Sequence, residues 1–267
     1  MSNAASASAT GFHARTLNER IKGFPYWLVA FIGVLLWMLF LIWTNPKYNE
    51  AYHFIIPGIR TTISATVTSF GVATAIGLIV GLGRIAHNTF IRNLAQFYIE
   101  FVRGVPILPL LFTISYVLVP QAATAFGLNN ADLSFFIRAT TGLSVIYGAY
   151  LAEVFRGGIE SVPKGQTEAG RSLGMSRSQT LFRITLPQAL RNMTPAIGND
   201  LIAMLKDSSL LSVLAINEIT QNAKLYASST FEFRPTYFVL TFLYASMTLL
   251  LSLLIRWYRG KLGLEDD

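Results

Sequence analysis

The amino-acid sequence predicts an all-α polytopic membrane protein with about six transmembrane helices. First, 52% of its 267 residues are hydrophobic and only 13% are charged, whereas soluble domains carry about 25% charged residues. Second, the chain contains several uncharged runs of the length that a helix needs to cross the hydrocarbon core, roughly 20 residues. Third, basic residues gather in alternate loops between these runs, as in membrane proteins with a fixed orientation.

Six runs are expected to form the spans, and the fifth is the least typical because Asp200, Lys206 and Asp207 interrupt it. In chain order the runs are Tyr26–Trp43, Thr61–Gly83, Gly104–Ala131, Ala139–Ala152, Asn192–Asn217 and Pro235–Ile255.

The segment before the first run is rich in Ser and Ala, so residues 1–25 are expected to form a disordered cytoplasmic tail. Basic residues precede the first run, as they do in a signal peptide. However, Thr44-Asn45-Pro46 follows the run in place of a small-x-small cleavage site. Residues 26–44 are therefore interpreted as a retained, extra N-terminal transmembrane helix.

The loop charges predict which side of the membrane each loop occupies. With the N-terminus inside, twelve Lys and Arg residues fall on the cytoplasmic side and five on the other side. This bias places both termini in the cytoplasm, together with the long polar loop at residues 160–187.

Several classes of function lack the residues that they require. There is no cysteine, and His13, His53 and His87 are scattered without metal-ligand spacing. No P-loop string is present to hold ATP phosphates, and no catalytic constellation is visible. The net charge of +7 follows from the basic cytoplasmic loops rather than from a nucleic-acid site. The sequence therefore favours a protein that is not an enzyme, has no cofactor or metal site of its own and binds no nucleic acid.

The polar loop is predicted to fold as helix, turn and helix. Pro163 is placed to begin the first helix, and Gly174 has the character of a C′ stop. The segment Ser176-Arg177-Ser178-Gln179 then matches a capping box that starts the next helix. On composition alone, such a loop is more often a solvated connector than a docking element.

The spacing within this loop is more specific than its composition. It consists of Glu168-Ala169-Gly170, three residues, Gly174, nine residues, and Ile184-Thr185-Leu186-Pro187. This pattern resembles the EAA loop in the permease subunits of ATP-binding-cassette (ABC) importers, and it departs only at Gly170, where the family has Ala.

Flanking strings extend the resemblance to residues 55–262. They resemble polar amino-acid permeases of the histidine, arginine, glutamine or glutamate type, although Val105 stands where the family often has Thr. The matching strings are Glu100–Pro106, Ala149–Ile159, Ser161–Gln166, Leu186–Ala189 and Leu205–Leu210. The extra N-terminal helix is found in some members only.

The resemblance implies a five-helix importer core that works as a dimer with a second permease subunit, the same or a homologous chain. A cytoplasmic ABC ATPase dimer would hold the ATP and magnesium. A periplasmic or lipid-anchored binding protein would deliver a polar amino acid across the bacterial inner (plasma) membrane. The ATPase-coupling residues would be Lys164, Glu168, Ala169, Gly170, Ser172, Leu173 and Gly174, with Glu168 as the polar contact and Gly174 as the close-packing turn.

Charged and polar residues inside the spans are candidates for the substrate path, because a charge in the membrane usually faces a partner or a cavity. Glu153 would either line the path or form an internal ion pair with Arg156, three residues further on. Thr61 and Thr62 would bind a zwitterion or their own helix backbone. The other candidates are Arg103, Asn199, Lys206 and Asp207.

The alternative function is a secondary amino-acid transporter driven by an ion gradient. Such a transporter would be expected to show inverted repeats and broken helices at the membrane midplane, and no convincing repeat is visible in the sequence. The sequence identifies neither the amino acid that is carried nor whether the dimer is homomeric.

Overall fold

The computed structural model describes residues 26–129 and 133–261, which are helical apart from short connections. The predicted tail at residues 1–25 lies outside the described residues. The α-helices are α2 (Tyr26–Thr44), α3 (Pro46–Ile55), α4 (Ile59–Arg84), α5 (Thr89–Gly104), α6 (Ile107–Phe112), α7 (Val119–Ala125), α8 (Phe135–Glu160), α9 (Lys164–Ser172), α10 (Arg177–Thr180), α11 (Leu186–Asp207), α12 (Ile219–Thr230) and α13 (Phe233–Lys261). The segments Ile56–Gly58 and Ser208–Leu214 are 3₁₀-helical, and Thr113–Leu118 and Leu181–Thr185 are π-helical.

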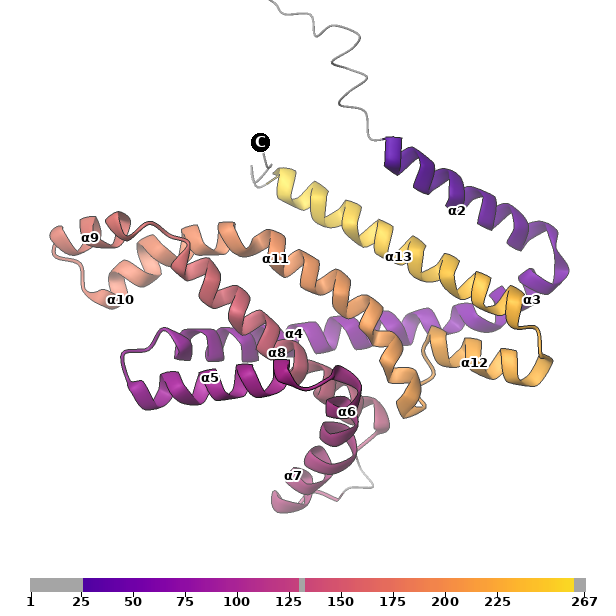
Figure 1. Cartoon of the computed structure of the whole chain (residues 1–267), viewed down its shortest axis with the longest axis horizontal. Coiled ribbons are helices and arrows are strands. Elements are labelled where there is room, and N and C mark those ends of the chain that lie inside the picture. The colour runs from indigo at the N-terminus through magenta and orange to yellow at the C-terminus, as the bar shows by residue number, and fades with distance from the viewer. Residues whose placement is uncertain (1–25, 130–132, 262–267) are drawn as a thin grey trace, which may run out of the picture.

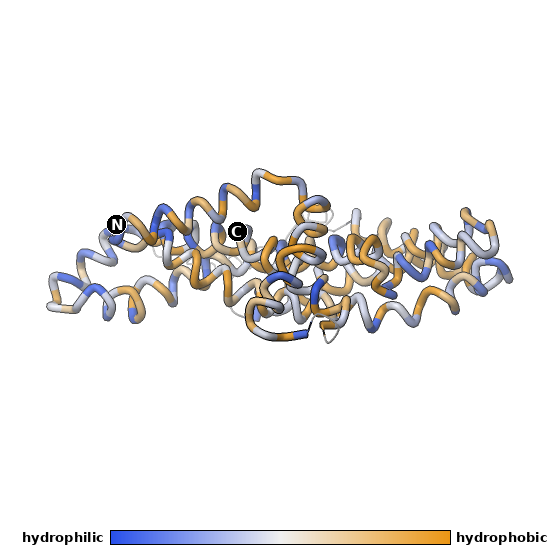
Figure 2. The backbone as a smooth tube through the Cα atoms, turned by 90° about the horizontal axis from the view of Figure 1, so that it is seen from below, coloured by the Kyte–Doolittle hydropathy of each residue, from blue (hydrophilic) through white to orange (hydrophobic). Residues whose placement is uncertain are grey.

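Within the described part of the chain, five helical stretches are long and apolar enough to cross a membrane. Figure 2 shows apolar residues along the length of the long helices. The five stretches are Tyr26–Thr44, Pro46–Arg84, Ile107–Ala125, Phe135–Glu160 and Phe233–Lys261. They correspond to the first, second, third, fourth and sixth predicted runs, so the all-α membrane fold is confirmed.

The fifth predicted run, Asn192–Asn217, needs correction. Its helix, α11, begins earlier, at Leu186, and ends at Asp207, and the rest of the predicted run is the 3₁₀-helix Ser208–Leu214 followed by a turn. At this end of the helix, the hydroxyl of Ser208 donates to the carbonyl oxygen of Leu205 at 2.7 Å. At 22 residues, α11 is still about 33 Å long, but its charged residues make it less apolar than the other five.

The centre of the bundle is the close packing of α4 against α8. A Cβ atom built on Gly77 would lie 2.7 Å from the Cβ of Leu151, and one built on Gly81 would lie 2.9 Å from the carbonyl oxygen of Ala152. These glycines let the two backbones approach closely, which is how helices commonly associate in a membrane. Gly71, on the same helix, faces open space.

A second packing unit joins the extra N-terminal helix to the end of the chain. Helix α2 lies beside α13 (Figure 1), with Trp37 edge-on to Phe238 at 5.8 Å and Arg256 over the ring of Trp27 at 5.6 Å. Lys47, near the start of α3, forms an ion pair with Glu232, just before α13. The predicted helix at residues 26–44 is therefore packed onto the core.

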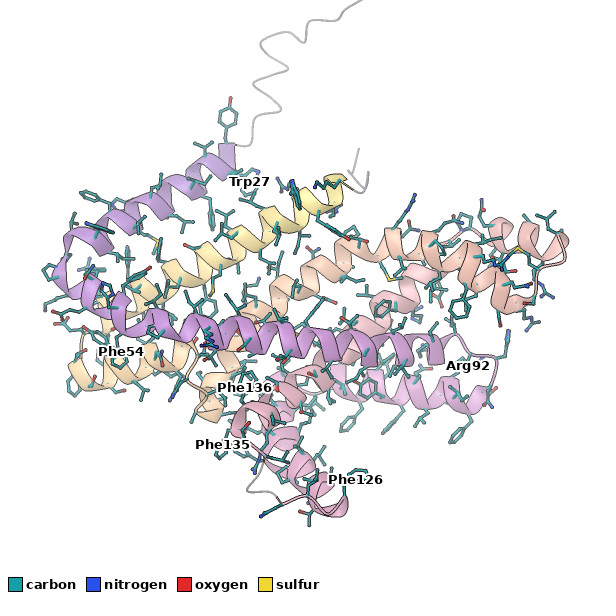
Figure 3. All side chains as sticks on the ribbon, turned by 180° about the vertical axis from the view of Figure 1, so that it is seen from behind. Trp27, Phe54, Arg92, Phe126, Phe135 and Phe136 are labelled. Atoms are coloured by element: carbon teal, nitrogen blue, oxygen red, sulfur yellow. The ribbon has the colours of Figure 1, made fainter. Side chains whose placement is uncertain are left out.

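The molecule is elongated, with α9 and α10 at one end and α3 and α12 at the other (Figure 1). Large apolar side chains project from its outer surface, as Trp27, Phe54 and Phe126 show in Figure 3. Such a surface suits contact with lipid rather than water.

Candidate functional site

The polar loop folds as the sequence predicts. Helix α9 begins directly after Pro163 and ends before Gly174, whose φ of +82° is the left-handed conformation that a C′ glycine adopts. The amide of Met175 donates to the carbonyl oxygen of Gly170 at 3.2 Å, which closes the turn. Ser176 and Gln179 then exchange the two hydrogen bonds of a capping box, at 3.2 and 2.8 Å. The predicted stop and the predicted cap are both confirmed.

The two faces of α9 differ in their surroundings. Gly170 is buried on the inner face, whereas Glu168, Ala169, Ser172 and Leu173 are exposed, Leu173 by 84%. No hydrogen bond or ion pair of the Glu168 carboxylate occurs among the described residues. The outer face is therefore free to contact another molecule.

Gly170, the one departure from the EAA pattern, has a packing reason. A Cβ atom at this position would lie 2.6 Å from Cδ1 of Ile184 and 3.2 Å from Cγ2 of Thr180. The missing methyl group thus lets the isoleucine of the same motif pack directly against the helix.

The loop is continuous with the interior of the bundle. Ile184 belongs to the π-helical turn Leu181–Thr185, which joins α10 to α11 without a break in the helix. Helix α11 then carries Asp200 and Asp207 into the bundle. The loop and these two carboxylates are therefore joined by one packed contact and one uninterrupted helical segment.

Three helices bring a cluster of polar side chains together against one face of α8, called the interior cluster below, with Arg103 at its exposed edge. The guanidinium of Arg103, at the end of α5, lies over the ring of Tyr150 on α8 at 5.6 Å. One helical turn away, the hydroxyl of Tyr147 donates to Asp207 of α11 at 2.8 Å. The sequence singles out Arg103 and Asp207, and the fold places both of them against the same face of α8.

Asp200 adds a second carboxylate to this cluster. Its Oδ2 atom is buried and has no hydrogen-bond partner among the described residues, and the charge of Arg103 acts on both Asp200 and Glu153. Because a buried carboxylate oxygen without a partner is costly, a donor such as an ammonium group would be stabilised there. A guanidinium beside free carboxylate oxygens can hold the two charged ends of a zwitterion.

Sequence reasoning missed Tyr147 and Tyr150 and gave Asp200 no binding role. The available signal was the spacing of Tyr147, Tyr150 and Glu153, which lie three residues apart and so share one face of a helix. What could not be read from the sequence was that Arg103 and Asp207 face this stripe.

Glu153 forms the ion pair that was one of the two arrangements considered for it, and its place on a substrate path stays a prediction. Arg156 donates to its carboxylate from Nε at 3.1 Å and from the terminal nitrogen at 2.7 Å. The Glu153 side chain nevertheless remains 23% exposed. It lines a groove of about 340 Å³ between α8 and α11, together with Ser161 and Asn192. The ion pair therefore does not remove Glu153 from the groove.

The other path candidates lie outside the interior cluster. Thr62 is fully buried, accepts from the amide of Ile219 at 3.3 Å and donates to the carbonyl oxygen of Gly58 at 3.1 Å. Thr61 is half-buried next to it, while Asn199 and Lys206 are exposed on α11. Their roles in a substrate path stay predictions, and the contacts of Thr62 are those of a packing residue. No group of three or more metal-ligating side chains occurs within residues 26–129 and 133–261.

Comparisons with known proteins agree with this architecture. Residues 73–263 match the family described as "Binding-protein-dependent transport system inner membrane component". The L-cystine transport system permease protein TcyB of Bacillus subtilis is 36% identical over 73% of this chain and 81% of its own length. The histidine/lysine/arginine/ornithine transport system permease protein HisQ of Escherichia coli is 33% identical over 70% of this chain and 82% of its own length.

A solved structure described as an amino acid ABC transporter with histidines superposes with a TM-score of 0.69 at 32% identity, and the match covers 80% of this chain and 95% of that one. The match to the family covers well over half of the chain and includes the polar loop. The chain therefore belongs to the binding-protein-dependent transport system inner membrane components, as a multi-pass permease of the amino-acid ABC transporter type.

Proposed function

We propose that this chain is the membrane-spanning half of an importer that moves a polar amino acid across the bacterial inner membrane, with both termini in the cytoplasm. The observation that carries the proposal is the exposed outer face of α9, with Glu168 and Leu173 free at one end of the bundle. Because this chain has no ATP-binding string of its own, ATP-driven import requires a separate ATPase chain that binds to an exposed surface such as this one.

The partners follow from this surface and from the family. An ABC ATPase dimer binds ATP and magnesium and docks on α9, a second permease chain completes the pathway, and a binding protein delivers the amino acid from outside. Arg103 and the carboxylates of Asp200 and Asp207 suit the carboxylate and ammonium groups that all amino acids share. Because relatives named for cystine and for basic amino acids are similarly identical to this chain, the cargo is left at the level of a polar amino acid.

The geometry provides a route for coupling. Closure of the ATPase dimer moves α9, and Gly170 presses on Ile184 through their close contact. The continuous helix from Arg177 to Asp207 then shifts Asp207 relative to Tyr147 on α8. The interior cluster is thereby opened to one side of the membrane at a time, which is alternating access.

The first experiment is to solubilise the chain gently from its native membrane and to identify the proteins that co-purify with it. An ATPase is expected, and uptake in reconstituted vesicles should require ATP even when ion gradients are maintained. Recovery of the chain alone from several mild detergents, together with uptake that follows an ion gradient without ATP, would instead favour a secondary transporter.

Replacing Glu153 with Gln is expected to lower uptake by about tenfold while the complex still assembles, because the neutral side chain no longer attracts a cationic group in the groove. Glu160→Gln is the matched control, since Glu160 also pairs with Arg156 but is exposed at the end of α8. Uptake by each variant would be measured at equal protein levels. Equal uptake in both variants would show that Glu153 acts only as an ion-pair partner of Arg156.

A further inference from the structure

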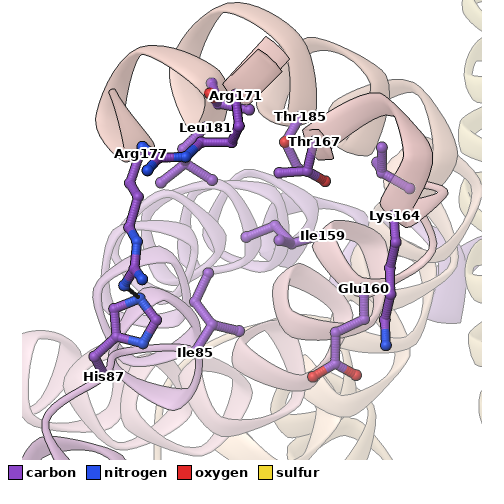
Figure 4. Close-up of a pocket in the computed structure, with 12 residues that line it drawn as sticks. Ile85, His87, Ile159, Glu160, Lys164, Thr167, Arg171, Arg177, Leu181 and Thr185 are labelled. Atoms are coloured by element: carbon purple, nitrogen blue, oxygen red, sulfur yellow. Dashed lines mark hydrogen bonds between the residues drawn. The ribbon is translucent and has the colours of Figure 1, made fainter. Parts of the chain in front are cut away.

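A cavity of about 760 Å³ lies between the inner face of α9 and the ends of α4 and α8 (Figure 4). Lys164, Thr167 and Arg171 line it from α9, and their spacing of three and four residues places them on one side of the helix. Glu168 and Leu173 are not among its lining residues. The cavity thus borders the surface proposed for the ATPase and shares Lys164 with it, but it excludes Glu168 and Leu173.

The charge around this cavity is positive. Lys164, Arg171 and Arg177 all line it, and Arg177 contacts the His87 ring from the loop after α4. Its one acidic lining residue, Glu160, is paired with Arg156. The cavity therefore favours an anion, and guanidinium groups in particular bind phosphate well.

The inner part of the cavity is mostly apolar, and two buried threonines adjoin it: Thr180, whose hydroxyl donates to the carbonyl oxygen of Ser176, and Thr185. Ile85, Ile159, Val162 and Leu181 form this part, and Figure 4 shows Ile85 and Ile159 between the charged side chains. Thr185 also lines the cavity, although it is only 6% exposed, and its Oγ1 atom is buried without a hydrogen-bond partner among the described residues. Leaving a buried hydroxyl unpaired is costly, so a ligand oxygen at this position would be stabilised.

We propose that this cavity binds the phosphate head group of an acidic phospholipid from the cytoplasmic leaflet. Arg171 and Arg177 bind the phosphate, Thr185 donates to one of its oxygens, and the isoleucines contact the first part of an acyl chain. A lipid fits better than a soluble phosphate because apolar side chains adjoin the cationic ones, and because α4 and α8 are spanning helices that end at the cavity. Basic pockets at this depth of a membrane protein suit anionic head groups.

A lipid at this position would contact α9 as well as the ends of α4 and α8. It would therefore bias the position of α9, so that the acidic lipid content of the membrane tunes coupling. This inference goes beyond the proposed import function and uses only its cytoplasmic orientation.

The test is native mass spectrometry of the full-length protein in neutral detergent, titrated with phosphatidylglycerol. Wild-type protein is expected to retain bound phosphatidylglycerol, and the double variant Arg171→Gln/Arg177→Gln to bind it roughly thirtyfold more weakly. The matched control is Arg92→Gln/Arg191→Gln, which removes the same charge at exposed positions outside the cavity and should bind like wild type. Equal weakening in both double variants would mean that surface charge alone attracts the lipid, and would overturn the proposal.

Further arms distinguish the lipid from other ligands. Phosphatidylcholine is expected to bind much more weakly than phosphatidylglycerol, and millimolar inorganic phosphate should not displace the lipid; the opposite result in either arm would overturn the proposal.

Thr185→Val keeps the shape of the side chain and removes an unpaired hydroxyl. This variant should therefore fold normally and bind the lipid severalfold more weakly, whereas unchanged binding would overturn the role of Thr185. Because no ATPase is present, failure here leaves the importer proposal intact, and the reverse also holds.

Discussion

Replacing Gly174 with Val is expected to abolish the coupling between ATP hydrolysis and uptake. Gly174 has a φ of +82°, and a residue with a Cβ atom in this conformation costs roughly 1–2 kcal/mol, more when it is β-branched. The strain falls on the turn that fixes the end of α9, so the outer face of the helix no longer presents Glu168 in one orientation. We expect at least about tenfold less ATPase to co-purify with the variant, measured by quantitative pull-down.

The control for this substitution is Gly127→Val. Gly127 also has a positive φ, of +73°, and a Cβ atom at either glycine would meet nothing within 4 Å. The two variants therefore introduce the same backbone strain at different places, since Gly127 lies between α7 and α8. If both variants lost the ATPase to the same extent, the effect would be general destabilisation and α9 would not be the docking element.

Replacing Gly77 with Val is expected to prevent stable assembly of the bundle. A Cβ atom at this position would lie 2.7 Å from the Cβ of Leu151 and 3.1 Å from the amide nitrogen of Ala152, and the backbone of α8 cannot move aside as a flexible side chain can. Overpacking of this kind costs about 1–3 kcal/mol or more. We expect little monodisperse protein by size-exclusion chromatography and a clearly lower unfolding temperature in detergent.

Gly71→Val is the matched control on the same helix, because no atom lies within 4 Å of a Cβ at Gly71. It should behave like wild type in both measurements. Normal assembly of the Gly77 variant, or an equal defect at Gly71, would contradict the close packing of α4 against α8.

The sequence alone determined the features that depend on local physics. Apolar runs of sufficient length predicted the membrane helices, because every backbone polar group in a bilayer must be satisfied within a helix. The end of α9 at Gly174 and the capping box at Ser176 were also predictable, since each is set by interactions within a few residues of the chain. The spacing of the polar loop was sufficient to indicate its family.

Which polar residues meet depends on the packing of distant helices. Arg103, Tyr150, Asp200 and Asp207 come from three helices that are distant in sequence, and helical periodicity gives the face of each residue but not its partner. The same reason explains why the sequence did not show that Thr62 accepts a hydrogen bond from the amide of Ile219, or that Thr185 lines a cavity. The end of α11 at Asp207 was missed because the apolar pattern continues beyond it, through the 3₁₀-helix Ser208–Leu214.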